Sequence, residues 1–212
     1  MIKLLLLDWN GTLFDDREVV YGSVAEIFRR FNLSPPLPDI YFREITAQFM
    51  DFYFAHGIPI EATPEALNDI RHEYFLVHWQ EGKLRLGARE LLMFARNRGL
   101  RTIIASAEVN KILQQRVYAL NIRQLLSFVH GGLKNKTNDL KRIVAGANIK
   151  PEQAIYVDDT KDGITSAKSA GLKTIGFTNG YNSHGQIGSA SPTHFAHSLW
   201  DVIGILEEKE LN

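Results

Sequence analysis

Short apolar runs alternate with longer amphipathic segments along most of the chain. Four runs have the length and composition of buried parallel strands, and they cover residues 2–7, 100–105, 154–157 and 173–177. Between the runs, apolar residues recur at helical spacing, as do Leu113, Val117 and Leu120. Strands that alternate with helices predict βαβ units and an α/β fold, with a doubly wound, mostly parallel sheet of the Rossmann-like type.

The segment from residue 16 to residue 81 breaks this alternation, because it contains no convincing strand. The spacing of its apolar residues predicts three helices, over residues 20–31, 42–52 and 64–77. Thr63 is a typical N-cap, and Pro64 suits the first position of the third helix. We therefore predict a small all-α domain, residues 16–81, inserted after the first strand of an α/β domain that comprises residues 1–15 and 82–212.

Composition narrows the class of protein. Hydrophobic residues make up 45% of the 212 positions and charged residues 23%, which is ordinary for a globular protein. The chain has 24 basic and 24 acidic residues, so we expect neither a nucleic-acid partner nor a membrane partner. It has no cysteine, which favours a cytoplasmic location, and the apolar run in MIKLLLLDWN is too short for a signal peptide or a membrane span.

Polar residues follow the first two apolar runs, at the end of the sheet where α/β proteins bind ligands. Asp8 follows the first run and precedes Gly11 and Thr12; by itself this is more typical of a turn at a strand end. Ser106 and Ala107 follow the second run, and a predicted helix starts just after them. A hydroxyl beside helix N-terminal amides binds oxyanions, and it is equally typical of a plain helix cap.

Two lysines and a group of acids complete the polar positions. Lys134 and Lys136 precede another predicted helix, where either one faces a phosphate or is a solvated charge. Asp158 and Asp159 end the third run, and Asp162 follows soon after. Carboxylates suit Mg²⁺, and the alternative is a capping cluster at the next helix. Three acids at one strand end repel one another without a cation, so the pattern favours a metal.

Taken in order, these positions resemble the motifs of the haloacid dehalogenase superfamily of phosphohydrolases, and the resemblance covers nearly the whole chain. The first motif resembles DWNGTLFDD at residues 8–16, the second IIASA at 103–107, the third Lys136, and the fourth VDDTKDGITSAKSAG at 157–171. The helical insertion is similar to the cap domain of the phosphoglycolate phosphatase type.

The resemblance implies roles for these residues. Asp8 is expected to attack phosphorus and form an aspartyl-phosphate, while Ser106 and Lys136 hold the phosphoryl oxygens and balance their charge. The implied catalytic residues are Asp8, Asn10, Ser106 and Lys136. The implied phosphate-binding residues are Asp8, Asn10, Gly11, Thr12, Ser106, Ala107 and Lys136. The implied cofactor is Mg²⁺, and its candidate ligands are Asp8, the backbone carbonyl of Asn10, Asp159 and Asp158.

Two positions depart from the family pattern. Where this chain has Asn10, the phosphatases of the family usually have an Asp, which acts first as a general acid and then as a general base. An amide has no proton to exchange at neutral pH, so we expect slow hydrolysis of alkyl phosphates. The fourth motif usually supplies a further carboxylate where this chain has Gly163, and a glycine where it has Asp158. Either Asp158 or Asp162 is expected to compensate, with weak Mg²⁺ binding as the consequence.

We therefore expect a cytoplasmic, Mg²⁺-dependent phosphohydrolase that acts on a small phosphorylated metabolite, as a monomer or a homodimer. The alternative is a catalytically weak or inactive protein of the same fold that binds a phosphorylated ligand. Restoring the acid with Asn10→Asp separates the two, because activity rises in a compromised enzyme and stays absent in a binding protein.

Overall fold

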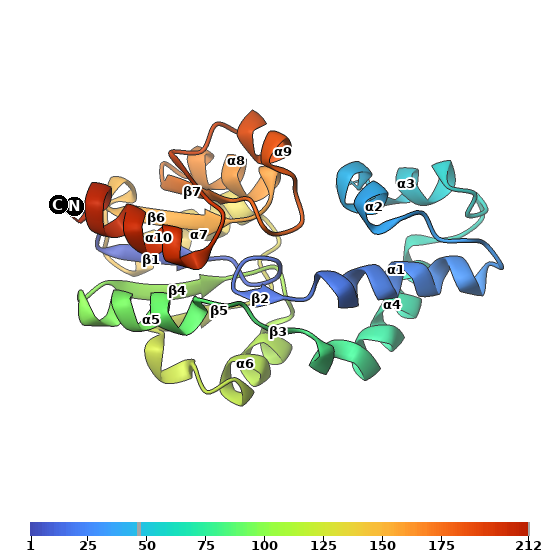
Figure 1. Cartoon of the computed structure of the whole chain (residues 1–212), viewed down its shortest axis with the longest axis horizontal. Helices are drawn as coiled ribbons and strands as arrows, with labels where there is room; N and C mark the ends of the chain where they lie inside the picture. Colours follow the sequence, from blue (N-terminus) through green and yellow to red (C-terminus); the bar gives the residue numbers. More distant parts are fainter. Residues whose placement is uncertain (46–47, 212) are drawn as a thin grey trace. The chain divides into compact units, whose positions relative to one another are not determined.

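The computed structural model describes residues 1–45 and 48–211. The chain divides into two compact units (Figure 1). The larger comprises Met1–Asp15 and Leu84–Asn212, and the smaller comprises Asp16–Lys83. In the part of the chain that is described, no helix combines the length and the hydropathy that crossing a membrane requires.

The larger unit contains a six-stranded sheet in the order β5-β4-β1-β6-β7-β8, and all its strand pairs are parallel. The strands are β1 (Leu4–Leu7), β4 (Arg101–Ala105), β5 (Phe128–His130), β6 (Ala154–Asp158), β7 (Lys173–Phe177) and β8 (His194–Ala196). The helices are α5 (Ala88–Asn97), α6 (Asn110–Ala119), α7 (Lys136–Gly146), α8 (Lys161–Ser169), α9 (His184–Ser189) and α10 (Leu199–Ile205). Shorter turns are η2 (Arg123–Leu125), η3 (Pro151–Gln153) and the π-helical η4 (Leu206–Glu210). The predicted doubly wound α/β fold is confirmed.

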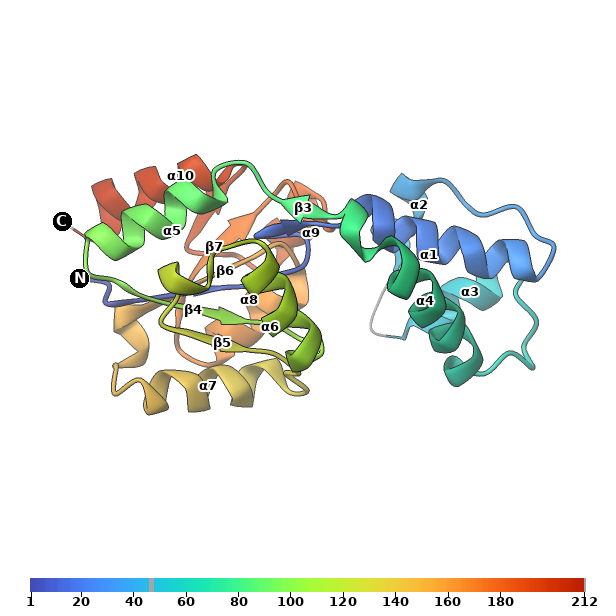
Figure 2. The same cartoon turned by 90° about the horizontal axis from the view of Figure 1, so that it is seen from below.

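Strand β1 lies in the middle of this sheet and is buried on both faces, which explains its uninterrupted run of leucines. Leu5 and Leu7 pack in the cluster that includes the apolar faces of α5 and α10. Leu4 and Leu6 point the other way, into the cluster formed with α7 and α8. Figure 2 shows α5 and α10 on one side of the sheet and α7 on the other. The period of two along β1 thus divides the core into two layers.

The edge strands β5 and β8 are three residues long and were not predicted. Phe128 on β5 and Phe195 on β8 are 50% and 41% exposed, so neither strand gives the continuous apolar run of a buried strand. On β5, the carbonyl of Val129 accepts a hydrogen bond of 3.1 Å from the side-chain amide of Gln114 on α6. This edge is therefore partly covered by a side chain.

Two short strands, β2 (Phe14–Asp15) and β3 (Lys83–Leu84), form a separate two-stranded sheet. Arg85 follows β3 and fixes the chain just before β2. Its Nε donates to the carbonyl of Thr12 and one terminal nitrogen to that of Gly11, both at 3.1 Å. Sequence reasoning did not single out Arg85, although it holds the loop that follows Asp8.

The smaller unit is helical in its described residues, apart from Lys83 in β3. Its helices are α1 (Arg17–Arg30), α2 (Pro38–Glu44), α3 (Phe49–Ala55), α4 (Pro64–His78) and the 3₁₀ turn η1 (Trp79–Glu81). Helix α1 packs against α4. Thr63 caps α4 as predicted, because its hydroxyl accepts from the amide of Ala66 at 3.2 Å. Phe28, Tyr41, Phe52 and Tyr53 are buried and pack edge-on or tilted against one another.

The helix predicted over residues 42–52 is wrong as one continuous element. Helix α2 ends at Glu44, and Ile45 has extended dihedral angles, φ −65° and ψ 133°. Helix α3 starts at Phe49, and residues 46 and 47 of the predicted helix lie outside the described residues. The spacing that predicts the third helix puts Leu67 and Val77 on one face. In α4, Leu67 is buried as expected, whereas Val77 is 74% exposed.

Candidate active site

Asp8 lies directly after β1, at the carboxyl end of the sheet, and is 6% exposed. Its amide donates to the carbonyl of Val157 on the neighbouring strand at 2.9 Å, which fixes the backbone at that point. The turn that follows is tight, because Gly11 has φ +76° and its amide donates to the carbonyl of Phe14 at 2.8 Å. Asp8 is thus presented from a rigid strand end.

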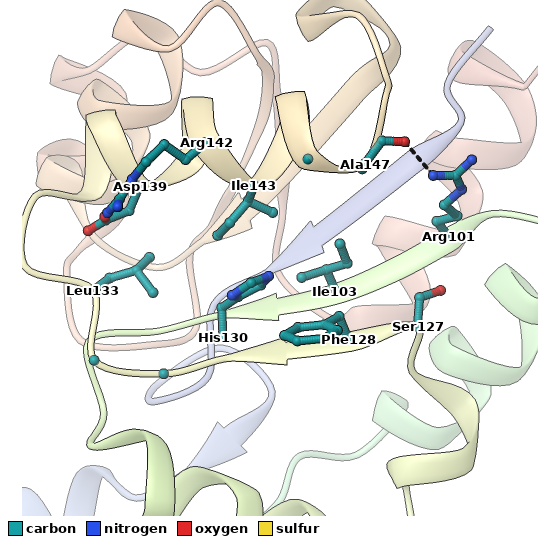
Figure 3. A pocket seen from close by; sticks show the side chains of 13 residues that line it. Arg101, Ile103, Ser127, Phe128, His130, Leu133, Asp139, Arg142, Ile143 and Ala147 are labelled. Atoms are coloured by element: carbon teal, nitrogen blue, oxygen red, sulfur yellow. Dashed lines mark hydrogen bonds and ion pairs between the residues drawn. The ribbon is translucent and has the colours of Figure 1, made fainter.

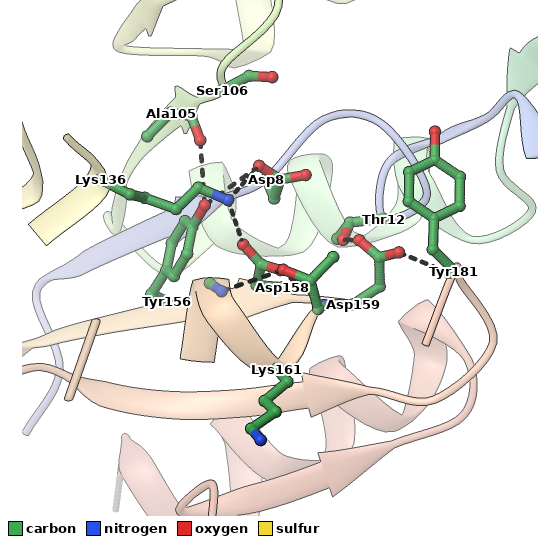
Figure 4. Close-up of polar contacts among 12 residues, drawn as sticks. Asp8, Thr12, Ala105, Ser106, Lys136, Tyr156, Asp158, Asp159, Lys161 and Tyr181 are labelled. Carbon is green, nitrogen blue, oxygen red and sulfur yellow. Dashed lines mark hydrogen bonds and ion pairs between the residues drawn. The ribbon is translucent and has the colours of Figure 1, made fainter. Parts of the chain in front are cut away.

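Lys136 is the first residue of α7, and its ammonium group lies between two carboxylates (Figure 4). Nζ donates to Oδ1 of Asp8 at 3.1 Å and to Oδ2 of Asp158 at 2.6 Å. The other lysine in this loop, Lys134, is exposed, so Lys136 is the lysine that joins the site. Residues 128 positions apart in the sequence, Asp8 and Lys136, are brought together by the sheet topology.

The carboxylate of Asp158 occupies the space beside Gly163. It accepts hydrogen bonds from both the amide and the hydroxyl of Thr160, at 2.7 and 2.6 Å, in addition to that from Lys136. A methyl group built on Gly163 would overlap all three atoms of this carboxylate. Asp162, the other residue considered as a substitute, is exposed. The carboxylate near residue 163 therefore comes from Asp158.

Asp159 lies between two glycines. A methyl group on either Gly11 or Gly180 would overlap the Asp159 side chain. Its two carboxylate oxygens accept from the hydroxyl of Thr12 at 2.8 Å and from the amide of Tyr181 at 2.7 Å. Residues 178–181 follow β7, the last strand that the sequence predicts, and the sequence by itself fits either a loop that borders the site or a plain turn. In the structure it positions Asp159.

Tyr156 is a site residue that sequence reasoning missed. It lies on β6, is fully buried, and its hydroxyl is 3.2 Å from Oδ1 of Asp8 and 3.1 Å from the carbonyl oxygen of Ala105. Lys136 Nζ and the Tyr156 hydroxyl thus approach the same oxygen of Asp8. The period of two along β6 places Tyr156 on the same face as Asp158, which is the signal that was available.

The other predicted site residues, Asn10, Ser106 and Ala107, lie in the loops that follow β1 and β4. Ser106 follows β4, is 2% exposed, and its Oγ accepts from the amide of Glu108 at 3.1 Å. Ala107 is exposed and Asn10 is half-buried. No described hydrogen bond joins the Ser106 hydroxyl to Asp8.

Buried negative charge dominates the site. Burial raises the pKa of Asp8 to about 7; Lys136 acts in the opposite direction, and Asp158 adds to the rise. Burial also raises the pKa of Asp159 well above its usual value, as do the charges of Asp158 and Asp8. Burial alone would lower the pKa of Lys136, but the two adjacent carboxylates raise it, so the lysine stays charged. Asp8 and Asp158 thus share one ammonium group, while Asp159 is held by the Thr12 hydroxyl and the Tyr181 amide.

The chain is similar to known proteins in both sequence and fold. Residues 5–177 match the model of the family described as haloacid dehalogenase-like hydrolase. The chain is 26% identical over 220 residues to a phosphoglycolate phosphatase of Vibrio cholerae, with 97% of each chain covered. It is 22% identical over 212 residues to a 5'-nucleotidase of Pseudomonas aeruginosa, with 96% of this chain and 95% of the relative covered.

Among solved structures, a predicted phosphatase from Clostridium acetobutylicum has a TM-score of 0.84 at 21% identity, covering 98% of this chain and 99% of that one. This likeness shows the fold. The match to the family model, over most of the length, shows that the chain belongs to the haloacid dehalogenase-like hydrolase family. The predicted family and enzyme class, a phosphatase of this family, are confirmed.

Proposed function

We propose that this chain is a Mg²⁺-dependent phosphatase that hydrolyses a small phosphorylated metabolite through an aspartyl-phosphate on Asp8. The observation that carries the proposal is the buried carboxylate of Asp8, held at one oxygen by Lys136 at 3.1 Å, with the buried carboxylates of Asp158 and Asp159 close by. A carboxylate fixed at a strand end is a suitable nucleophile for phosphoryl transfer.

In the proposed reaction, a carboxylate oxygen of Asp8 attacks phosphorus and the bond from phosphorus to the ester oxygen breaks. The leaving oxygen takes a proton from solvent, because Asn10 has none to give, and departs as an alcohol. Water then attacks the phosphorus of the aspartyl-phosphate, which releases inorganic phosphate and restores the carboxylate. Lys136 offsets negative charge on the phosphoryl group, and Ser106 is the proposed donor to one of its oxygens.

The residues present fit Mg²⁺ by their chemistry. Asp8 and Asp159 are buried carboxylates, and the backbone carbonyl of Asn10 is the third proposed ligand. Among the described residues no group of three His, Asp or Glu side chains is placed to hold a metal ion. Mg²⁺ commonly takes one or two carboxylates and fills the rest of its shell with water and substrate phosphate. When bound, the ion supplies positive charge that stabilises the transferring phosphoryl group.

Asp158 is proposed as the carboxylate that replaces the one missing at Gly163. It supports the site by holding Lys136 at 2.6 Å and by adding negative charge near the proposed ion. The sequence predicts weak Mg²⁺ binding, and we propose that Asp158→Asn weakens it further, whereas Asp162→Asn does not. Isothermal titration with MgCl₂, which needs no turnover, decides this.

Asn10 is proposed to limit the rate. Its amide neither donates a proton to the leaving oxygen nor takes one from the attacking water at neutral pH. Aryl and acyl phosphates need less help in the first step, because their leaving oxygens are better stabilised. The second step lacks a base for every substrate, so phosphorylated Asp8 is expected to accumulate.

The substrate class follows from the family and not from a single contact. We propose that residues 16–81 act as a cap domain, which favours small substrates because closure excludes water. The relatives named above include a phosphoglycolate phosphatase and a 5'-nucleotidase, so a small phosphate monoester is as far as the proposal goes. A cytoplasmic location, and a monomer or homodimer without nucleic-acid or membrane partners, complete the proposal.

A second candidate function rests on Asn10, which removes the usual acid. It is a protein that binds a phosphorylated ligand and turns it over weakly or not at all. The test is phosphate release from p-nitrophenyl phosphate and acetyl phosphate with MgCl₂ or EDTA. We expect release that needs Mg²⁺, is lost in Asp8→Asn and is kept in Asp162→Asn, the matched exposed acid. No release and no phosphorylated Asp8 in mass spectrometry would support the binding protein instead.

A further inference from the structure

A cavity of about 560 Å³ lies in the larger unit, between α7 on one side and strands β4 and β5 on the other (Figure 3). This volume is in the range of sites that bind small molecules, roughly 300–1,000 Å³. Its apolar walls come from Ile103, Phe128, Leu133 and Ile143. None of these four residues is among those that form the site around Asp8.

An aromatic surface forms one wall. The rings of Phe128 and His130 are 4.3 Å apart at an interplanar angle of 35°, and Phe128 is 50% exposed. Burial lowers the pKa of His130, so its imidazole is neutral at neutral pH. No hydrogen bond or ion pair to this imidazole is found among the described residues. A flat aromatic group is thus able to lie on these rings.

Guanidinium groups mark two ends of the cavity, as the labelled side chains in Figure 3 show. Arg142 is 79% exposed at its side chain and pairs with Asp139. Arg101 donates to the carbonyl of Ala147. A guanidinium has five N–H donors, so both arginines retain donors for a ligand. With one carboxylate and two guanidinium groups in its lining, the cavity favours an anion.

The walls of this cavity are bonded to the loops that carry Ser106 and Lys136. Oδ2 of Asp139 accepts from the amides of Lys134 and Asn135, both at 3.0 Å, directly before Lys136. The amide of Leu133 donates to the carbonyl of Ser106 at 3.1 Å. Asp139 thus links Arg142, which pairs with its Oδ1, to the loop before Lys136, which is held by its Oδ2. A ligand bound to Arg142 is therefore one side chain away from the groups that hold this loop.

We propose that this cavity is a binding site for a small, planar aromatic anion, and that its occupancy stabilises the loop before Lys136. The ring lies on Phe128 and His130, and the anionic group is bound by Arg142. This inference stands apart from the proposed phosphatase activity, because neither binding nor loop order requires turnover.

The probe is naphthalene-2-sulfonate, which is a planar aromatic anion and carries no phosphate ester. We expect saturable one-to-one binding in isothermal titration, and about tenfold weaker binding in Phe128→Ser and in Arg142→Gln. The matched controls are Phe195→Ser and Arg98→Gln. Phe195 is 41% exposed and stacks on His184 at 4.6 Å on the other edge strand, and Arg98 lies over Phe94. These controls are expected to bind like the unmodified chain.

Two further ligands separate the parts of the probe. 2-Naphthol keeps the ring without the anion, and sulfate keeps the anion without the ring, so both are expected to bind more weakly. Hydrogen exchange supplies the second readout. The amides of Lys134 and Asn135 are expected to exchange more slowly when the probe is bound. In Phe128→Ser, the same probe concentration is expected to leave their exchange unchanged. No saturable binding, equal losses in the Phe195→Ser control, or unchanged exchange at saturation overturns the proposal.

Discussion

The carboxylate of Asp158 lies where the side chain of residue 163 would begin, and Gly163 leaves the room for it. The two positions are five residues apart, one at the end of β6 and the other in the first turn of α8. A glycine and an acid have thus exchanged places relative to the family pattern. As a consequence, the residue that position 163 accepts depends on the side chain at position 158, and the reverse also holds.

This dependence predicts that Gly163→Ala lowers the free energy of unfolding when residue 158 is Asp and raises it when residue 158 is Gly. Gly163→Ala forces a methyl group into the Asp158 carboxylate, and such overpacking costs about 1–3 kcal/mol of unfolding free energy. In an Asp158→Gly background the space is open, and alanine in a helix is favoured over glycine by about 1 kcal/mol. Urea denaturation of the four variants of this cycle measures both effects. Destabilisation by Gly163→Ala in both backgrounds would falsify the relationship.

Restoring an acid at residue 10 is expected to raise activity. Asn10→Asp supplies a group that protonates the leaving oxygen and later deprotonates water, and general acid–base catalysis contributes about 10²–10⁴-fold. The gain in kcat is expected to be larger for an alkyl phosphate such as glycerol 3-phosphate than for p-nitrophenyl phosphate. Steady-state kinetics with both substrates decides, and an equal gain on the two would contradict the assigned role.

Tyr156→Phe tests whether the hydroxyl positions Asp8. Removing one hydrogen bond to a charged group costs about 1.5–3 kcal/mol, so kcat is expected to fall at least about tenfold with KM little changed. The ring stays in place, and the rate at which phosphorylated Asp8 forms, measured by rapid quench, is expected to fall with kcat. Tyr21→Phe is the control, because Tyr21 donates to a backbone carbonyl in the smaller unit. An unchanged rate of phosphorylation rules out the positioning role.

Glu210 is expected to affect how the free energy of unfolding changes as the pH falls. Burial alone would raise the pKa of Glu210, but hydrogen bonds from Lys173 and from His194, the latter at 2.7 Å, outweigh burial and lower the pKa below its usual value. A lowered pKa in the folded state means that stabilisation is present above the unfolded pKa and is lost as pH falls through the folded one.

Glu210→Gln is therefore expected to destabilise the protein at pH 7 by about 1–3 kcal/mol, and to have a shrinking effect as the pH falls below about 4. Thermal unfolding across this range measures the difference. The control is Glu208→Gln, since Glu208 is exposed and close by. A difference between variant and unmodified chain that is constant with pH would show that the charge of Glu210 is not involved.

The central strands could be predicted from the sequence because strands buried on both faces consist of uninterrupted apolar residues. Strand β7 was predicted at its observed bounds, Lys173–Phe177, from its apolar run alone. The edge strands were missed because Phe128 and Phe195 are exposed, so their segments resemble loops. The break in the second predicted helix was missed because Ile45 fits a helical face, although its backbone is extended.

The sequence predicts which residues meet at the site wherever the strand order and direction alone bring them together. The carboxyl ends of parallel strands meet at one edge, so Asp8, Asp158 and Asp159 were expected to converge, and they do. Their catalytic and metal-binding roles stay predictions. Tyr156 was missed because a buried tyrosine inside an apolar run is indistinguishable from core until its hydroxyl is placed. The link between Asp158 and Gly163 requires three-dimensional distances that the sequence does not contain.

The hydrogen bond from Gln114 to the carbonyl of Val129 bears on how this protein behaves at high concentration. An uncovered edge strand is a template on which a second copy adds its own strand, and proteins that leave such edges open tend to aggregate. A side-chain amide on the edge of β5 takes up an acceptor that an incoming strand would need. The same edge borders the cavity between β5 and α7, so Gln114 occupies one acceptor on an edge strand that also lines this cavity.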